Sequence, residues 1–132
     1  MKKKRSRGIR KATMLCEEQG GDYGVRFNFL EFFAGGGMAR AGLSKNWAPL
    51  WANDFCEKKA AVYRRNWGNG EMRVGDVAEV MPTSLPWAEM AWGSFPCQDL
   101  SLAGDQTGIG AAGDVDKTRS GTFWPFWRLM DE

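Results

Sequence analysis

The sequence predicts an α/β protein built on a Rossmann-like, parallel sheet, and three observations support this prediction. Short apolar segments rich in aromatic and branched residues alternate with segments of helical periodicity. Three consecutive glycines follow the first apolar segment, where a doubly wound sheet has its first ligand-binding turn. An acidic residue follows both the second and the third apolar segments, at the strand ends where such folds bind ligands.

The first half of the chain is expected to alternate strands and helices. Residues 25–33 are aromatic and branched, which is typical of a buried strand, and the glycines at 35–37 end it. Residues 57–67 carry apolar side chains at helical spacing up to the stop signal Gly68-Asn69-Gly70. In chain order we expect a strand over 25–33, a helix beginning over 38–43, a strand over 49–53, a helix over 57–67 and a strand over 72–74.

The second half is expected to add a strand, a long loop and a helix. The apolar residues 87–93 predict the strand. Residues 103–121 are rich in glycine and lack periodicity, and loops of this length in compact domains are usually functional or disordered. Residues 122–130 predict a helix, in which Pro125 has to lie in the first turn. We therefore expect a partial parallel sheet with right-handed crossovers.

The chain of 132 residues is long enough for one domain at most. We assign residues 1–25 to a flexible basic tail and residues 26–132 to the domain. Residues 1–11 hold seven basic side chains and no acid. Two interpretations of this tail stay open, a solvated terminus and a segment that follows nucleic-acid phosphates.

Composition argues against several classes of protein. No apolar run approaches the roughly 20 residues that cross a bilayer, and no secretory signal is present, so we expect a cytoplasmic protein. The three cysteines are an odd and sparse set, which favours reduced thiols over a disulfide framework. Because the chain has no histidine and no Cys-x-x-Cys pair, we expect no metal site.

A cysteine that follows a proline is the strongest candidate for chemistry. Cys97 follows Pro96 just after the expected strand 87–93 and precedes the long loop. A thiol held at a strand end and facing a loop is well placed to act as a nucleophile, which it does as the thiolate. The competing interpretation is a buried, inert thiol.

The glycine turn and two acids predict a nucleoside-binding site. Asp54 lies 19 residues after Gly35, a spacing typical of an acid that binds a ribose, and Asp76 is placed to meet an adenine amino group. The glycines do not complete a Gly-x-Gly-x-x-Gly fingerprint, which favours a ligand without a pyrophosphate. The alternative is a tight turn that binds nothing. Glu31, near the turn, either pairs with a ligand ammonium group or faces water.

These segments resemble the motifs of the DNA cytosine-5 methyltransferases, from about Phe27 to Arg128. The most specific match is the catalytic motif, Gly93-Ser94-Phe95-Pro96-Cys97-Gln98. The resemblance implies a Rossmann-like, S-adenosylmethionine-dependent methyltransferase fold with S-adenosyl-L-methionine as the cofactor. It assigns to the cofactor Phe33, Ala34, Gly35, Gly36 and Gly37 of the first motif, Asp54 and Phe55 at ribose and adenine, Asp76 and Val77 near the adenine amino group, and Thr122 in the segment Arg119-Ser120-Gly121-Thr122-Phe123-Trp124.

The resemblance also implies a covalent reaction on double-stranded DNA. The Cys97 thiolate is expected to add to C6 of a cytosine that has left the duplex, which makes C5 nucleophilic enough to accept the methyl group. Pro96 fixes the backbone before the nucleophile, and Gln98 belongs to the same motif. Ser101 and Arg119 are assigned to DNA contact and to a catalytic loop, about Asp99 to Ser120, that closes over the flipped base.

The chain departs from this family by what it lacks. It has no Glu-Asn-Val triplet, no Gln-x-Arg-x-Arg motif and no target recognition domain. We therefore expect a partial catalytic domain, either an incomplete fragment or one half of an enzyme that a C-terminal subunit completes. Two other classes stay open, a non-catalytic module that binds S-adenosylmethionine or DNA and a nicotinamide oxidoreductase domain. The DNA target, an RNA substrate, and the choice between a restriction-modification enzyme and an orphan or phage methylase also stay open.

Overall fold

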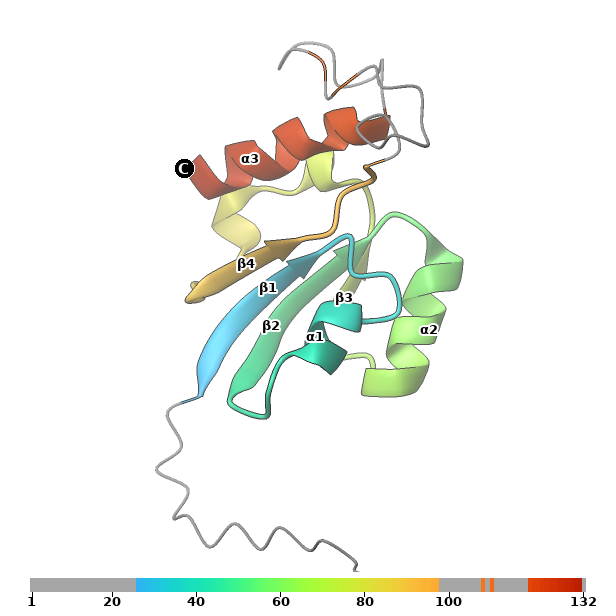
Figure 1. The fold of residues 1–132 in the computed structure, drawn as a ribbon, viewed down its shortest axis with the longest axis vertical. Coiled ribbons are helices and arrows are strands. Elements are labelled where there is room, and N and C mark those ends of the chain that lie inside the picture. Colours follow the sequence, from blue (N-terminus) through green and yellow to red (C-terminus); the bar gives the residue numbers. More distant parts are fainter. Residues whose placement is uncertain (1–25, 98–107, 109, 111–118, 132) are drawn as a thin grey trace, which may run out of the picture.

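The computed structural model describes residues 26–97, 108, 110 and 119–131. The expected tail over 1–25 and most of the expected loop, including Gln98 and Ser101, lie outside these residues. Within the described residues, four parallel strands form one sheet in the order β3-β2-β1-β4 (Figure 1). The elements are β1 (Phe27–Phe32), α1 (Met38–Gly42), β2 (Trp47–Asp54), α2 (Glu57–Trp67), β3 (Met72–Val74), β4 (Met90–Gly93) and α3 (Phe123–Asp131), with the 3-10 turns η1 (Val77–Glu79), η2 (Pro82–Ser84) and η3 (Arg119–Thr122).

The predicted α/β fold with a parallel sheet is confirmed, and most elements lie where the sequence pattern predicts them. The bounds of α2 and β3 are those expected. β4 begins at Met90 rather than at residue 87. Trp87 follows Pro86 and is 77% exposed, and the first bond from this segment to β1 runs from the Glu89 amide to the Asn28 carbonyl, at 3.1 Å.

Two short elements between β3 and β4 were not predicted. Residues 77–79 and 82–84 form 3-10 turns, which are too short to show a hydrophobic period in the sequence. The helix expected over 122–130 is α3, which begins one residue later at Phe123, and the 3-10 turn over residues 119–122 before it was not predicted. Pro125 lies in the first turn of α3, as its missing amide hydrogen requires.

The pairing of β1 with β2 contains a bulge. Phe29 faces Pro49, whereas Leu30 faces Trp51, so Leu50 is an extra residue in β2. A proline next to a bulge is tolerated in a sheet because the ladder is already interrupted there. After the bulge, the second half of β2 resumes regular pairing up to Asn53.

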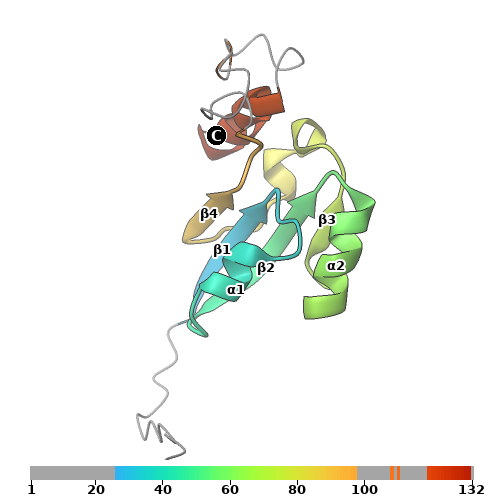
Figure 2. The same ribbon diagram turned by 45° about the vertical axis from the view of Figure 1, so that its right-hand side comes forward.

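Each face of the sheet has its own hydrophobic core. Figures 1 and 2 show α1 and α2 on one face and α3 with the 3-10 turns on the other. The core under α2 consists of Ala34, Ala52, Ala60, Tyr63 and Met72. The core under α3 consists of Leu30, Phe32, Trp51, Val77 and Leu129. Covering both faces leaves the strand ends as the place where loops can meet a ligand.

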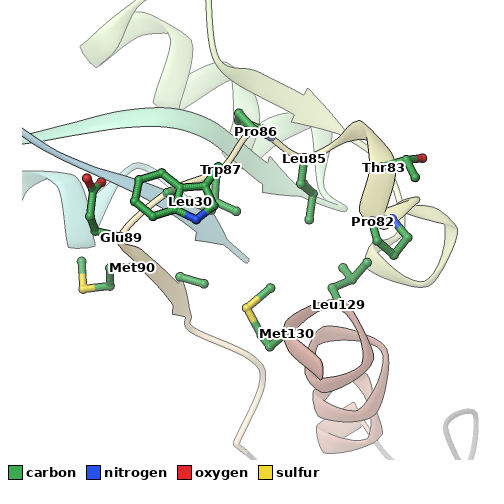
Figure 3. Close-up of a pocket in the computed structure, with 12 residues that line it drawn as sticks. Leu30, Pro82, Thr83, Leu85, Pro86, Trp87, Glu89, Met90, Leu129 and Met130 are labelled. Atoms are coloured by element: carbon green, nitrogen blue, oxygen red, sulfur yellow. The ribbon is translucent and has the colours of Figure 1, made fainter. Parts of the chain in front are cut away.

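A cavity of about 620 Å³ runs beside β4, which is the outer strand of the sheet (Figure 3). Leu30, Met90 and Ala91 line it from the sheet, and Leu129 and Met130 line it from the end of α3. Within the described part of the chain, no strand pairs with the outer side of β4. No helix in that part is long and apolar enough to cross a membrane.

Candidate functional site

The carboxyl ends of the strands and the segments that follow them surround a second cavity, of about 670 Å³. Its size lies in the range of roughly 300–1,000 Å³ that is usual for small-molecule sites. Because the strands are parallel, segments distant in the sequence meet here. The lining residues are Phe33, Asn53, Asp54, Phe55, Cys56, Lys59, Gly75, Asp76, Val77, Ser94, Phe95, Pro96, Cys97, Arg119 and Thr122.

The turn after β1 adopts a backbone conformation that few residues tolerate. Phe33 has φ of +56°, in the left-handed region that is costly for a bulky side chain, and Gly35 has φ of +55°. A Cβ built on Gly35 would meet no atom within 4 Å, so this side of the turn is open. Gly37 is different, because a Cβ there would lie 2.8 Å from Cδ1 of Trp67. The turn is therefore pressed against α2 on one side and open on the other.

Asp54 ties the end of β2 to this turn. Its Oδ2 accepts the Gly35 amide hydrogen at 2.8 Å, and its Oδ1 accepts the Cys56 amide hydrogen at 2.8 Å. The residue is 5% exposed and lines the cavity. A carboxylate offers about four acceptor positions, so these two bonds leave capacity for a ligand hydroxyl.

The turn after β3 carries the second acid. Asp76 is exposed at the cavity, and its Oδ1 accepts the Ala78 amide hydrogen at 2.9 Å at the start of η1. Phe55 lines the same cavity and is 75% exposed. An exposed aromatic ring and a carboxylate in one cavity suit a planar base with an amino group.

The segment after β4 brings the candidate nucleophile to the same cavity. The Ser94 amide donates to the Phe32 carbonyl at 3.2 Å, which fixes where the chain leaves the sheet. The Phe95 ring packs on Phe123 of α3, with centroids 5.2 Å apart. Pro96 and Cys97 follow, and the Cys97 thiol is free and exposed. Its position at the cavity argues against the interpretation of a buried, inert thiol.

Glu31 neither faces water nor lines the cavity where it could meet a ligand ammonium group. Its side chain is 1% exposed and is not among the residues that line the cavity. Its Oε1 accepts the Ala39 amide hydrogen at 3.1 Å at the start of α1, whereas Oε2 is buried without a partner among the described residues. Burial raises the pKa of this carboxyl above its usual value.

Several predicted residues meet at the cavity and others do not. Those that line it are Phe33, Asp54, Phe55, Asp76, Val77, Pro96, Cys97, Arg119 and Thr122. The glycine motif contributes differently, since Ala34 is buried and the backbone of Gly36 and Gly37 packs against α2. Sequence reasoning did not assign Asn53, Cys56, Lys59, Gly75, Ser94 and Phe95. Three of these, Gly75, Ser94 and Phe95, stood inside the matched motifs, whereas Asn53 and Lys59 gave no signal beyond their nearness to Asp54.

Comparison with known proteins matches residues 27–132 to the family described as C-5 cytosine-specific DNA methylase. The type II methyltransferase M.NgoFVII of Neisseria gonorrhoeae is 31% identical over 93 residues, covering 67% of this chain and 25% of that protein. M.HhaI of Haemophilus parahaemolyticus is 29% identical over 105 residues, covering 79% of this chain and 30% of that protein. The chain therefore spans about a quarter to a third of the length of these relatives.

The crystal structure of S. pombe Dnmt2 methyltransferase has a similar fold. Its TM-score is 0.55 with 18% identity, and the match covers 80% of this chain and 32% of that one. At this level of identity the similarity concerns the fold alone, which is the Rossmann-like, partial parallel sheet predicted from the sequence.

Proposed function

The chain belongs to the C-5 cytosine-specific DNA methylase family, and on this premise we propose that it carries the cofactor-binding and nucleophile-bearing part of a DNA cytosine-5 methyltransferase. The observation that carries the proposal is that one cavity is lined both by Asp54 and Asp76 and by the exposed Cys97. A methyl donor and a thiol nucleophile have to act on the same base, so they need one shared site. The proposal includes a cytoplasmic location and double-stranded DNA as the substrate.

Enzymes of this family use S-adenosylmethionine, and the residues present fit this group. The open side of Gly35 leaves room for a ligand to approach the backbone. We assign Asp54 to a ribose hydroxyl, Asp76 to the adenine amino group and the exposed Phe55 ring to the face of the base, since all three line this cavity. When bound, the cofactor supplies a methyl group on a positively charged sulfur.

We assign the nucleophilic step to Cys97. Its sulfur forms a bond to C6 of the flipped cytosine, and the electron pair of the C5–C6 double bond moves so that C5 can take the methyl group. A base then removes the C5 proton, the double bond forms again, and the carbon–sulfur bond breaks to release the thiolate. Pro96 restrains the backbone before the sulfur, and the Phe95–Phe123 contact holds the same segment on α3.

We further propose that a second polypeptide, with the target recognition domain, completes the site. Two observations support this. The chain spans 25% and 30% of the two bacterial relatives described above. Among the residues that the structure describes, no strand pairs with the outer edge of β4, and this edge and the apolar cavity beside it are available to such a partner (Figure 3). Alone, the chain is expected to show no methylation.

The second candidate function is a non-catalytic remnant that binds S-adenosylmethionine or DNA. It is favoured by the same short span relative to the relatives. Reading the coding sequence that adjoins this one decides between the two. A frame with Glu-Asn-Val followed by Gln-x-Arg-x-Arg, whose product copurifies with the tagged chain, supports the half-enzyme. The absence of such a frame supports the remnant.

Binding to the chain alone tests the cofactor site directly. Calorimetry with S-adenosylhomocysteine is expected to show one site, and Asp76→Ala and Phe55→Ala are each expected to weaken it at least about tenfold. The control Trp87→Ala alters the other cavity and leaves this affinity unchanged. Absence of binding to the folded wild type would overturn the cofactor assignment.

The covalent step is tested on duplex DNA in which 5-fluorocytosine replaces cytosine. Fluorine at C5 leaves no proton to remove, so an adduct to the sulfur persists after methyl transfer and remains bound in a denaturing gel. With the completing polypeptide we expect such an adduct for the wild type and for Cys16→Ser, and none for Cys97→Ser. An adduct that survives Cys97→Ser would overturn the assignment of the nucleophile.

A further inference from the structure

Asn53 is a buried polar residue at the end of β2 that no sequence motif assigned. It is 2% exposed, it lines the cavity, and it precedes Asp54. Its Nδ2 donates to the Gly75 carbonyl at 3.0 Å and to the Arg73 carbonyl at 3.4 Å. We infer that Asn53 is a positioning residue, which acts through Gly75 to set how Asp76 meets the base of a nucleoside ligand.

The backbone of Gly75 is held on both sides by neighbouring residues of β2. Its amide donates to the Asp54 carbonyl at 3.2 Å, and its carbonyl accepts from the Asn53 side chain. The Gly75 carbonyl belongs to the planar peptide group that ends at the nitrogen of Asp76. Fixing that carbonyl therefore fixes the plane from which the Asp76 side chain leaves.

Asp76 itself has one oxygen committed and one available. Oδ1 accepts the Ala78 amide hydrogen at 2.9 Å, and no other described residue is bonded to this carboxylate by a hydrogen bond that the structure records. The side chain is exposed at the cavity. The direction of the Asp76 side chain thus depends on the Gly75–Asp76 peptide plane and on the start of η1. Asn53 controls the peptide plane.

A purely structural role for Asn53 makes a different prediction. If its amide only joined β2 to β3, its loss would weaken the binding of every ligand by the same factor. If it positions Asp76, its loss would weaken the binding of ligands that have the amino group Asp76 accepts, and would spare ligands that lack this group. The inference rests on the proposed function, because it assumes that Asp76 meets an adenine amino group.

The test compares S-adenosylhomocysteine with its analogue in which purine replaces adenine, so that only the amino group is missing. The wild type is expected to prefer the amino-bearing ligand about tenfold or more, as one hydrogen bond to a charged group allows. In Asn53→Ala, we expect this preference to fall to about twofold or less, while affinity for the purine analogue changes by less than about threefold. An unchanged preference, or an equal loss for both ligands, overturns the inference.

Three controls define the source of the effect. Asn69→Ala removes an exposed asparagine from the turn after α2 and is expected to keep the wild-type preference. Asp76→Ala is expected to abolish the preference, and adding Asn53→Ala to it should change nothing further. Asn53→Ser, whose short side chain does not span the same distance, replaces Asn53→Ala if the alanine variant does not fold.

Amide hydrogen exchange tests the inference without a ligand. The Ala78 amide is protected by its bond to Asp76, so in Asn53→Ala we expect it to exchange at least about tenfold faster while the β1 amides keep their rates. Unchanged protection of Ala78 overturns the inference. A wild type that binds neither ligand, or binds both equally, counts against the proposed function, and the exchange result then decides the role of Asn53 by itself.

Discussion

The carboxylate of Asp54 accepts the amide hydrogen of Gly35 at 2.8 Å, so the end of β2 holds the turn that follows β1. The other carboxylate oxygen holds the Cys56 amide at the entry to α2. Asp54 was predicted as a ribose-binding acid, and these bonds give it an additional role in shaping the site. The proposed ribose contact is compatible with these two bonds, because the acceptor capacity of the carboxylate exceeds two bonds.

Replacing Asp54 should therefore cost stability as well as affinity. Asp54→Ala leaves two amide hydrogens unpaired, and we expect the free energy of unfolding to fall by about 2–4 kcal/mol. Asp54→Asn keeps one acceptor oxygen, so its free energy of unfolding should fall by about half as much. Urea denaturation measures the effect, with the exposed Asp131→Asn at the end of α3 expected to stay within about 0.5 kcal/mol. Equal stability of Asp54→Ala and the wild type would show that these bonds are not formed in solution.

Two glycines close in sequence should respond in opposite ways to a methyl group. Gly37→Ala forces a side chain onto φ of +85° and toward Trp67, and we expect it to destabilise the chain by about 2–4 kcal/mol. A Cβ on Gly42 meets nothing within 4 Å, so Gly42→Ala should be neutral or stabilising by up to about 1 kcal/mol. Thermal unfolding of the pair makes the comparison. Equal stability of Gly37→Ala and Gly42→Ala would show that the turn does not pack against α2 in solution.

The buried Glu31 should make stability depend on pH. Its pKa is raised by burial, so between its ordinary value of 4.5 and the raised value the folded state binds more protons than the unfolded state. Stability attributable to this group is therefore present at low pH and is lost as pH rises through that window. Glu31→Gln cannot titrate, and the difference in unfolding free energy between wild type and variant should shrink as pH falls toward 4.5. A difference that is constant with pH would contradict the raised pKa.

The open edge of β4 should be visible in amide exchange of the isolated chain. The Ser94 amide donates to the Phe32 carbonyl of β1, and alternate residues of a strand direct their amides to opposite sides. The Trp92 amide therefore faces β1, whereas the Ala91 and Gly93 amides face the open side and should exchange at least about tenfold faster than the Trp92 amide. The completing polypeptide should slow the exchange of Ala91 and Gly93. Equal rates at Ala91 and Trp92 without a partner would mean that another strand already occupies the edge.

The sequence predicted the fold well because hydrophobic periodicity reports burial on each face of the sheet. The residues 57–67 showed a helical period and a clear stop signal, and α2 has those bounds. The turns at 77–79 and 82–84 were missed because three residues are too few to show a period. The bulge at Leu50 was also missed, because only the pairing with β1 defines it.

The candidate site was predictable where a single residue carries the chemistry and not where residues act through the backbone. Asp76 and Cys97 stood out by residue type and by place after a strand, and both line the cavity. Asn53 gave no such signal, since its side-chain amide donates to carbonyls twenty and twenty-two positions away in the chain. For Ala34 and Gly37 the structure shows packing neighbours in the core and in α2, which the sequence did not indicate, and their assignment to the cofactor stays a prediction.

The extra residue at Leu50 divides β2 into two halves that pair with β1 in different registers. The half of the strand before the bulge follows the connection from α1, whereas the half after it carries Asn53 and Asp54. A one-residue deletion at Leu50 should restore continuous pairing by shifting the first half of β2 toward the second half. Asn53 and Asp54 at the end of the strand should not move. A change of one residue at this point thus alters how the first half of β2 pairs and leaves the spacing from Asp54 onward constant.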